Sequence, residues 1–581
     1  MNNKEITTLW CRMIIEELGR HGIHRFCISP GSRSTPLTAA AARNAGTRCT
    51  IFPDERAAAF FALGFARATG KPAVLICTSG TAVANYFPAV VEASFSNLPI
   101  LVLSADRPFE LFETGANQTI RQQGLFGTYS RWNIELPEPS EAIPAEALLS
   151  TIDYAVARSL GSPPGPVHLN IPFREPFDPV NLSGPKPREA SLTLWKQNNE
   201  PLNRFALSRK IADRAVVDRT KALLKNASSP LIVAGQLDSR TDAEAIGSLA
   251  ETLDIPLYAD ISSQLRMDDT HAPLQPLLLS KRFTASFNPD LILHFGGKIV
   301  GKQLAITIKN RAPEHFIVIT NSSRRYNPDH NVTLQIEAEP GEFAKLLVPE
   351  KSRSGKHERS LKALSDEIEK ELDNYCASGK PLTEISTARI LSGMIPESHG
   401  LFIANSMPIR DMDTYAALRK NGSAPLCAMN RGASGIDGNI ATAAGLAQGL
   451  GTPVTLLIGD ISFLHDLNSL TLLQGMEQPL HIVVVNNNGG GIFSFLPVAT
   501  QKDIFETNFG TPQNYSIRAA AETFGISYNN PSSPESFKAS YADLSRSDVS
   551  GIIEVNGSRE ENLAEHRRVN EQLRNIIDRH I

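Results

Sequence analysis

Residues 454–491 read VTLLIGDISFLHDLNSLTLLQGMEQPLHIVVVNNNGGG, and they give the clearest indication of the fold class. Two mostly apolar runs of strand length, Val454–Ile458 and His481–Val485, flank a segment long enough for one helix. Each run ends in small and polar residues, which begin with Gly459 in the first case and Asn486 in the second. The pattern predicts a strand–helix–strand unit in which the two strands are parallel and their carboxyl ends lie side by side.

The two polar strand ends together predict a metal site. Asp460 and Asn487 would place a carboxylate and an amide oxygen at adjacent strand ends, and the carbonyl of Gly489 would add a third oxygen. Such oxygen ligands suit Mg²⁺, and an ion with few protein ligands normally completes its coordination with phosphate oxygens. An aspartate turn beside an unrelated glycine-rich loop is the alternative. The matched positions favour a metal–diphosphate site.

Apolar runs of strand length alternate with helical patterns along the rest of the chain, which is typical of α/β domains with parallel sheets. The chain has 581 residues, and a domain usually holds roughly 100–200. Polar segments near residues 179–201 and 350–360 divide the sequence. We therefore predict three doubly wound parallel-sheet α/β domains, at residues 1–183, 205–350 and 375–581.

The expected strands follow from the same runs. They are Arg25–Ser29, Cys49–Pro53, Ala73–Thr78, Ile100–Ser104 and Val167–Ile171 in the first domain; Leu231–Ala234, Leu257–Ala259, Leu291–Phe295 and Phe316–Thr320 in the second; and Leu401–Ala404, Val454–Ile458, His481–Val485 and Ile552–Val555 in the third.

The composition of the sequence argues against several classes of protein. The sequence is 41% hydrophobic and 20% charged, as in globular proteins, and 57 basic against 61 acidic residues give a net charge of −4. This balance argues against a nucleic-acid-binding protein. The apolar runs are too short to span a membrane, and Glu16, Glu17 and Arg20 interrupt any signal peptide. We expect a cytoplasmic protein whose six cysteines are reduced thiols of the core: Cys11, Cys27, Cys49, Cys77, Cys376 and Cys427.

With Gly459-Asp460 and Asn487 in this spacing, the chain resembles the thiamine diphosphate enzymes. Their first domain supplies a glutamate after its second strand, and Glu55 occupies that position here. The resemblance implies that Glu55 hydrogen-bonds the aminopyrimidine ring and promotes the imino tautomer that deprotonates C2 of the thiazolium. Ile436, in RGASGIDG at 431–438, matches the apolar residue that holds the two rings in a V shape.

The resemblance also implies a full set of cofactor contacts, with Mg²⁺ or Mn²⁺ held by Asp460, Asn487 and Gly489. Ile461 stands where the wider family has a further glycine, and we take this as a mark of one branch. The residues implied to contact the cofactor are Glu55, Asn405, Ser406, Ile436, Gly459, Asp460, Ile461, Ser462, Asn487, Gly489, Ile492 and Phe493.

Within that family, the chain is most similar to the carboligase branch that condenses 2-oxoglutarate with isochorismate in menaquinone biosynthesis. The motifs SPGSRSTP (29–36), SADRP (104–108), GANQTIRQ (115–122) and NSMPIR (405–410) carry this resemblance. Guanidinium groups suit two dianionic substrates, because they bind both oxygens of a carboxylate. The implied substrate-binding residues are Ser32, Arg33, Arg107, Asn117, Gln118, Lys298, Arg410, Arg431 and Leu496, and those implied to act in catalysis are Glu55, Ser32, Arg33 and Gln118.

Three alternatives remain. Another thiamine diphosphate decarboxylase or carboligase, such as an acetolactate synthase, would share Glu55 and Asp460 but not the arginine set. A dinucleotide-binding oxidoreductase should show G-x-G-x-x-G after an early strand, and none is present. A non-catalytic three-domain scaffold would not need Glu55. The resemblance further implies that the first domain of one subunit faces the third domain of another, which makes a homodimer the minimum and a homotetramer the expected assembly.

Overall fold

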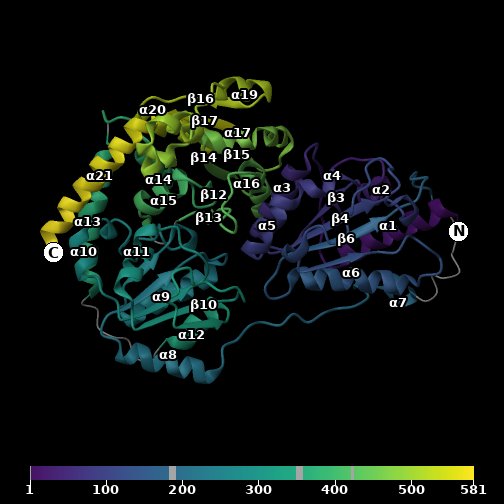
Figure 1. Ribbon diagram of the computed structural model, residues 1–581, viewed down its shortest axis with the longest axis horizontal. Helices are drawn as coiled ribbons and strands as arrows, with labels where there is room; N and C mark the ends of the chain where they lie inside the picture. Colours follow the sequence, from purple (N-terminus) through teal and green to yellow (C-terminus); the bar gives the residue numbers. More distant parts are fainter. Residues whose placement is uncertain (1, 182–191, 349–356, 378, 421–423) are drawn as a thin grey trace. The chain divides into compact units, whose positions relative to one another are not determined.

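The structure, a computed structural model, describes residues 2–181, 192–348, 357–377, 379–420 and 424–581 (Figure 1). It divides into two compact units. Unit 1 contains Met1–Ser208, Asn430–Gly451 and Asp466–Glu477, and unit 2 contains Arg209–Met429, Thr452–His465 and Gln478–Ile581. Much of the two polar segments expected to separate domains, at residues 182–191 and 350–356, lies outside the described residues, so the proposed domain boundaries stay a prediction.

Unit 1 is built on a six-stranded, all-parallel sheet. Its central strands are mostly apolar and are buried along their whole length, as expected where helices cover both faces of a sheet. The strand order is β2 (Arg48–Ile51), β1 (Arg25–Ile28), β3 (Ala73–Cys77), β4 (Ile100–Asp106), β6 (Pro166–Pro172) and β5 (Trp132–Glu135).

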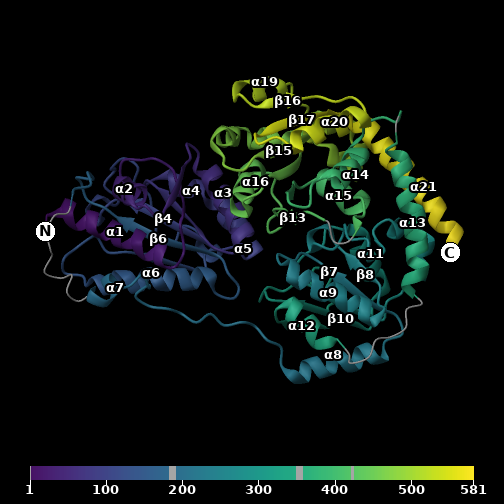
Figure 2. The ribbon, with the colours of Figure 1, turned by 180° about the vertical axis from the view of Figure 1, so that it is seen from behind.

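Helices cover both faces of this sheet (Figure 2). α1 (Asn3–Arg20), α2 (Thr35–Arg43) and α6 (Ala145–Leu160) pack together and share one apolar core with the sheet. α3 (Glu55–Thr69), α4 (Thr81–Asn85) and α5 (Phe87–Ser96) contact one another outside that core.

A second contact within unit 1 joins α3 to α16 (Asn439–Leu450), two helices far apart in the sequence (Figure 1). A Cβ atom on Gly64 would lie 1.9 Å from the carbonyl oxygen of Thr442, and one on Gly445 would lie 2.0 Å from the carbonyl oxygen of Phe61. Only glycine therefore allows this approach. The contacts advance along both helices in the same direction, so the helices are parallel and their amino ends lie together.

Unit 2 holds two further all-parallel sheets. The first has the order β11 (Leu334–Glu337), β10 (His315–Thr320), β9 (Leu291–Phe295), β7 (Pro230–Ala234) and β8 (Leu257–Ala259). The second has the order β13 (Leu426–Ala428), β12 (Gly400–Ile403), β14 (Val454–Gly459), β15 (Leu480–Asn486), β17 (Gly551–Asn556) and β16 (Ser527–Asn529).

One apolar core runs through unit 2 and contains residues from both of its sheets. Buried polar contacts add to it, since Asp413 accepts a hydrogen bond from the backbone N–H of Ile261 at 2.9 Å. The longer helices of the unit are α8 (Arg214–Asn226), α9 (Arg240–Leu253), α11 (Lys302–Arg311), α12 (Pro340–Leu347), α13 (His357–Tyr375), α14 (Glu384–Met394), α15 (Met407–Tyr415), α20 (Pro534–Ser545) and α21 (Arg559–His580), and the shorter ones include α10 (Lys281–Ser286), α17 (Asp460–His465) and α19 (Ile517–Thr523).

In each sheet the strand order reverses beside the first strand along the chain, and ligands of open α/β sheets bind beside such points. The reversal lies between β1 and β3 in unit 1, and between β12 and β14 in the last sheet of unit 2. Ser32 and Arg33 follow β1, Asn405 and Ser406 follow β12, and Asp460 follows β14. The fold thus places the residues singled out in the sequence where binding is expected.

The predicted fold class, three doubly wound α/β domains, is confirmed. All thirteen predicted strands are present, although the structure shifts most ends by one or two residues, as in β2, which ends at Ile51 rather than Pro53. Strands β5, β11, β13 and β16 were not predicted. Five cysteines are buried, but Cys49 is exposed because β2 is an edge strand, so its placement in the core is wrong. Of the helices in the described part of the chain, none combines the length and apolarity needed to cross a membrane.

Candidate active site

Asp460 lies where β14 ends and α17 begins. Its carboxylate accepts hydrogen bonds from the backbone N–H of Ile461 at 2.9 Å and of Gly489 at 2.7 Å. The hydroxyl of Tyr515 donates to the carbonyl oxygen of Asp460 at 2.8 Å. Burial raises the pKa of Asp460 to about 6. The predicted meeting of the two strand ends is therefore observed, because Gly489 belongs to the loop after β15.

Asn487 is buried one residue beyond β15. Its side-chain nitrogen donates to Glu384 Oε1 at 2.8 Å, whereas its side-chain oxygen is buried and has no hydrogen-bond partner. Buried amide oxygens are normally bonded, so this atom is available for a further partner. The pair Asp460 and Asn487 thus offers oxygen atoms at adjacent strand ends, as a hard cation requires.

The glycine-rich loop after Asn487 is held in place by main-chain contacts. Gly490 N donates to the carbonyl oxygen of Gly510 at 2.7 Å, and Gly489 has φ +139°, so a Cβ there would lie 1.9 Å from the same oxygen. Ile492 and Phe493 follow and are half-buried, and Phe493 packs edge-on against Phe509. The predicted apolar wall continues to Leu496, which is 40% exposed.

The segment after β12 begins at the strand end next to that of β14. Asn405 is buried, and Ser406 adopts φ +77°, a conformation that costs a non-glycine residue energy. α15 begins directly afterwards, and Arg410 in its first turns is exposed and donates to the carbonyl oxygen of Ser406. Gly459, at the end of β14, has no atom within 4 Å of where a Cβ would lie.

Glu55 is the first residue of α3 in unit 1 and is half-buried. The side-chain amide of Asn85 donates to Glu55 Oε2 at 3.3 Å. Asp54 caps the helix, because its carboxylate accepts from the backbone N–H of Arg56 at 2.8 Å. Because Asp54 caps the helix, the carboxyl group of Glu55 at the amino end of α3 is not used for capping.

The loop with Arg431 and Ile436 precedes α16 in the same unit. Buried Glu92 on α5 accepts hydrogen bonds from the backbone N–H of Gly432 at 2.7 Å and of Ala433 at 2.6 Å. Ile436 in this loop is 36% exposed. Since α3 and α16 are parallel, Glu55 and this loop lie at the same end of the helix pair.

Arg33 and Arg107 form a buried cationic pair after β1 and β4. Arg33 donates to the carbonyl oxygen of Phe173 and lies with its guanidinium 4.6 Å from the ring centroid of Phe177. Arg107 donates to Ser79 Oγ and, at 2.7 Å, to the carbonyl oxygen of Asn117. Burial and the neighbouring Arg107 lower the pKa of Arg33 to about 10. The carboxylate of Glu175 lies 3.6 Å from the Arg33 guanidinium and supplies part of the counter-charge, and a bound anionic ligand would supply more.

The remaining predicted substrate residues are more accessible. Ser32, Asn117 and Gln118 are exposed in unit 1, and Gln118 has φ +54°. Lys298, just beyond β9 in unit 2, is exposed, and Arg431 is half-buried. The roles of these side chains stay predictions.

Comparison with known proteins identifies the family. Residues 11–125 match the model of the thiamine pyrophosphate enzyme N-terminal TPP binding domain, residues 187–403 the middle domain of thiamine pyrophosphate enzymes, and residues 413–555 the C-terminal TPP binding domain. The chain belongs to the thiamine pyrophosphate enzyme family. Thiamine pyrophosphate, or thiamine diphosphate, is its cofactor.

Relatives within the thiamine pyrophosphate enzymes match over the full length. The chain is 99% identical over 581 residues, the whole of both chains, to 2-succinyl-5-enolpyruvyl-6-hydroxy-3-cyclohexene-1-carboxylate synthase of Chlorobium phaeobacteroides (strain BS1). Proteins of the same name from Prosthecochloris aestuarii and Chlorobium limicola are 56% and 52% identical; they cover 100% and 99% of this chain and are themselves covered over 99% and 98% of their length.

The residues present fit the cofactor of a thiamine pyrophosphate enzyme. Asn487 Oδ1 is a buried oxygen without a partner, and Asp460 is a carboxylate at the end of the neighbouring strand, so both could ligate a divalent cation. The open space at Gly459 would allow a diphosphate to approach the backbone, and the exposed Ile436 would gain an apolar contact. Ile461 and Ser462 follow Asp460 in the first turn of α17.

Sequence reasoning missed a buried polar network behind Asn487. Burial, with a further contribution from Asp411, raises the pKa of Glu384 to about 7. His566 Nε2 lies 2.8 Å from Asp411 Oδ1, and its Nδ1 lies 2.8 Å from the carbonyl oxygen of Asn562. Burial lowers the pKa of His566, but Asp411, the carbonyl oxygen of Asn562 and Glu384 together outweigh burial and raise it to about 9. Only the order Thr-Glu at 383–384, a helix start, could have drawn attention to Glu384.

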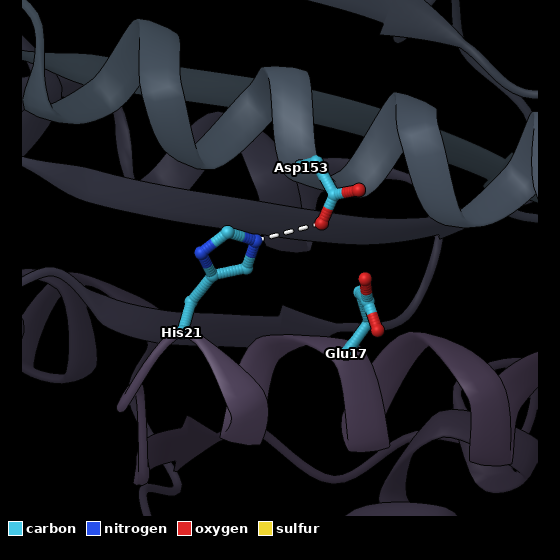
Figure 3. A group of neighbouring side chains, drawn as sticks. All are labelled: Glu17, His21 and Asp153. Carbon is cyan, nitrogen blue, oxygen red and sulfur yellow. Dashed lines mark hydrogen bonds and ion pairs between the residues drawn. The ribbon is translucent and has the colours of Figure 1, made fainter. Parts of the chain in front are cut away.

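A second titratable cluster, of Glu17, His21 and Asp153, lies on and between α1 and α6 in unit 1 (Figure 3). Both carboxylates already accept hydrogen bonds from the segment at 195–203. Trp195 Nε1 and Leu202 N donate to Glu17, and Asn203 N donates to Asp153 at 2.8 Å. The cluster therefore anchors this segment and offers little capacity for a cation.

Proposed function

We propose that the protein is a 2-succinyl-5-enolpyruvyl-6-hydroxy-3-cyclohexene-1-carboxylate synthase of menaquinone biosynthesis. It decarboxylates 2-oxoglutarate and adds the remaining four-carbon acyl unit in a 1,4 sense to isochorismate. The bond from the carboxylate to the keto carbon breaks and CO₂ leaves. The electron pair forms the new carbon–carbon bond, and the acceptor ring takes up one proton. The observation that carries this proposal is 99% identity, over the full length, to a protein of that name.

Bound thiamine diphosphate supplies the electron sink for the pair left by the departing carboxylate. Asp460, Asn487 and the carbonyl of Gly489 would hold Mg²⁺ or Mn²⁺ for the diphosphate. The carboxyl group of Glu55 would exchange a proton with the pyrimidine ring, and Ile436 would support the two rings of the cofactor. Ile492, Phe493 and Leu496 exclude water from the reacting carbon. Asn405, Ser406, Gly459, Ile461 and Ser462 supply further cofactor contacts.

The acidic substrates are bound by the cationic residues, with Ser32 and Gln118 as hydrogen-bonding groups. Arg33 and Arg107 support this assignment best, because they are buried close to each other and burial lowers the pKa of Arg33. Arg410, Arg431, Lys298 and Asn117 complete the proposed set. Their task is orientation and charge matching of two dianions.

The activity test uses purified protein with thiamine diphosphate and Mg²⁺. We expect CO₂ from 2-oxoglutarate, and one equivalent of the coupled product when isochorismate is added. Pyruvate takes the place of 2-oxoglutarate in a parallel reaction, which tests for an acetolactate synthase. Product from pyruvate but none from 2-oxoglutarate would refute the proposed function.

Arg33→Ala is expected to raise KM for one of the two acids by about 10- to 100-fold, because it removes a charged hydrogen-bond donor. The affinity for thiamine diphosphate should not change. Steady-state kinetics with each acid varied in turn, and calorimetric titration of the cofactor, measure the two effects. Arg48→Ala is the control: Arg48 is 68% exposed at the start of β2 and pairs with Glu477 at 3.7 Å. Unchanged KM values for both acids would contradict the assignment.

We also propose that the enzyme is a homodimer or homotetramer whose sites combine Glu55 of one chain with Asp460 of another. Two inactive variants, Glu55→Gln and Asp460→Ala, provide the test. Mixed after partial denaturation and refolded together, they should regain about one quarter of the wild-type activity, since half of the dimers are mixed and one of their two sites is intact. A mixture that stays inactive, with mixed dimers shown by mass spectrometry, would indicate a site within one chain.

We place the reaction in the cytoplasm. All six cysteines are free, as expected in a reducing compartment.

A further inference from the structure

Two consecutive asparagines lie at the end of β15, and the side-chain nitrogen of each donates a hydrogen bond to a buried glutamate. Asn486 Nδ2 donates to Glu554 Oε1 at 2.7 Å, and Asn487 Nδ2 donates to Glu384 Oε1 at 2.8 Å. Their oxygens differ. Asn486 Oδ1 accepts from the backbone N–H of Asn488 at 3.1 Å, whereas Asn487 Oδ1 is buried without a partner. The side-chain nitrogen of Asn487 therefore has a hydrogen-bond partner, whereas its side-chain oxygen has none.

We propose that Glu384 is a positioning residue that fixes the amide of Asn487 so that its oxygen faces the metal. The inference rests on the proposed function, in which Asn487 is a metal ligand. A carboxylate accepts hydrogen bonds and donates none, so only the amide nitrogen can face Glu384. A flipped amide would place the side-chain oxygen of Asn487 against the carboxylate oxygen of Glu384. It would also turn the NH₂ group toward the metal, and an amide nitrogen cannot be a metal ligand. Partners of this kind commonly set the orientation of metal ligands.

The surroundings hold both members of the pair in place. Glu384 is the first residue of α14, after the N-cap Thr383, and is 7% exposed. The amide of Asn487 lies against the main chain of Gly491, where a Cβ atom would be 2.5 Å from Nδ2. The side chain of Asn487 has little room to move, so the choice of amide orientation depends on the acceptor at Glu384.

The test measures Mn²⁺ binding by electron paramagnetic resonance, with excess thiamine diphosphate and at one fixed pH for all variants. Glu384→Met removes the acceptor and should weaken Mn²⁺ binding by about 10- to 100-fold. Glu384→Gln retains an oxygen that can accept from Asn487 and should lose much less. Glu554→Met is the matched control: it removes the same interaction from Asn486, whose oxygen is already bonded, and should leave the Mn²⁺ affinity unchanged.

A double-mutant cycle separates orientation from general damage. A carboxylate presents oxygen in either orientation, so Glu384→Met should not weaken Mn²⁺ binding when Asn487→Asp is also present. A purely structural role of Glu384 would produce the same loss in both backgrounds. Equal losses would therefore overturn the inference.

If Glu384→Met does not fold, Glu384→Asp replaces it in the comparison. Aspartate keeps the charge but withdraws the acceptor by one methylene group, whereas Glu384→Gln keeps the acceptor without the charge. Tighter Mn²⁺ binding by Glu384→Gln supports orientation, and tighter binding by Glu384→Asp overturns it in favour of charge. Wild-type protein that binds no Mn²⁺ with the cofactor would refute the proposed metal site itself, a result distinct from normal wild-type binding with an unaffected Glu384→Met.

Discussion

Glu55→Gln is expected to lower kcat by about 10³-fold, within the range for loss of a general acid–base group. Glutamine has nearly the same shape and can still accept the hydrogen bond that Asn85 donates to Glu55, so the fold of the α3 amino end should persist. It cannot exchange a proton with the pyrimidine ring. The affinities for thiamine diphosphate and Mg²⁺ should stay near wild-type values, because Glu55 is proposed to contact neither the diphosphate nor the metal.

Product formation gives kcat for this variant, and calorimetric titration gives the cofactor affinity. Glu16→Gln is a suitable control, since Glu16 pairs with Arg20 at 3.0 Å on α1. Turnover at the wild-type rate would show that Glu55 has no part in the chemistry. Loss of cofactor binding together with activity would point to a structural role instead.

Asp460→Ala is expected to weaken Mn²⁺ binding by more than about 100-fold and to abolish retention of thiamine diphosphate. The change removes a proposed metal ligand and also the acceptor for the backbone N–H groups of Ile461 and Gly489. The glycine loop then loses its contact with the end of β14. Metal titration followed by electron paramagnetic resonance, with cofactor retention after gel filtration, measures both effects.

The same carboxylate predicts the pH dependence of metal binding. Burial raises the pKa of Asp460 to about 6, so the proportion of protonated, non-ligating acid increases as the pH falls below that value. The Mn²⁺ affinity of the wild type should fall by about tenfold per pH unit there. Asp543→Ala, at an exposed residue paired with Arg546, should leave the affinity and its pH profile unchanged. A profile that is flat between pH values of about 7 and 5 would contradict a ligand role.

Most of the strands that sequence analysis recovered are more buried than those that it missed, although β2 was predicted despite being an exposed edge strand. β3 and β15 are continuous apolar runs because helices cover both of their faces, and such runs are visible in the sequence. β5, β11, β13 and β16 are edge strands of three or four residues, and most are half-exposed. Polar residues are acceptable there, so the apolar signal disappears.

The residues of the candidate site were likewise predicted only in part. Asp460, Asn487 and Gly489 were predicted because each directly follows a recognisable strand. Glu384 and Glu92 were not, since an acidic residue within or at the start of a helix is usually a solvated one. Glu384 contacts Asn487, and Glu92 contacts Gly432. Each partner lies more than a hundred residues away in the sequence, and no local pattern predicts such a contact.

Main-chain contacts set the spacing between α3 and α16, because glycines line the place where the two helices meet. At Gly64 and Gly445 backbone meets backbone, so no change of rotamer can lengthen or shorten the offset between the two helices. The amino end of one helix carries Glu55, and the loop before the other carries Ile436. Core substitutions elsewhere can therefore accumulate while this spacing stays constant, whereas a single methyl group at either glycine would push the acid and the isoleucine apart.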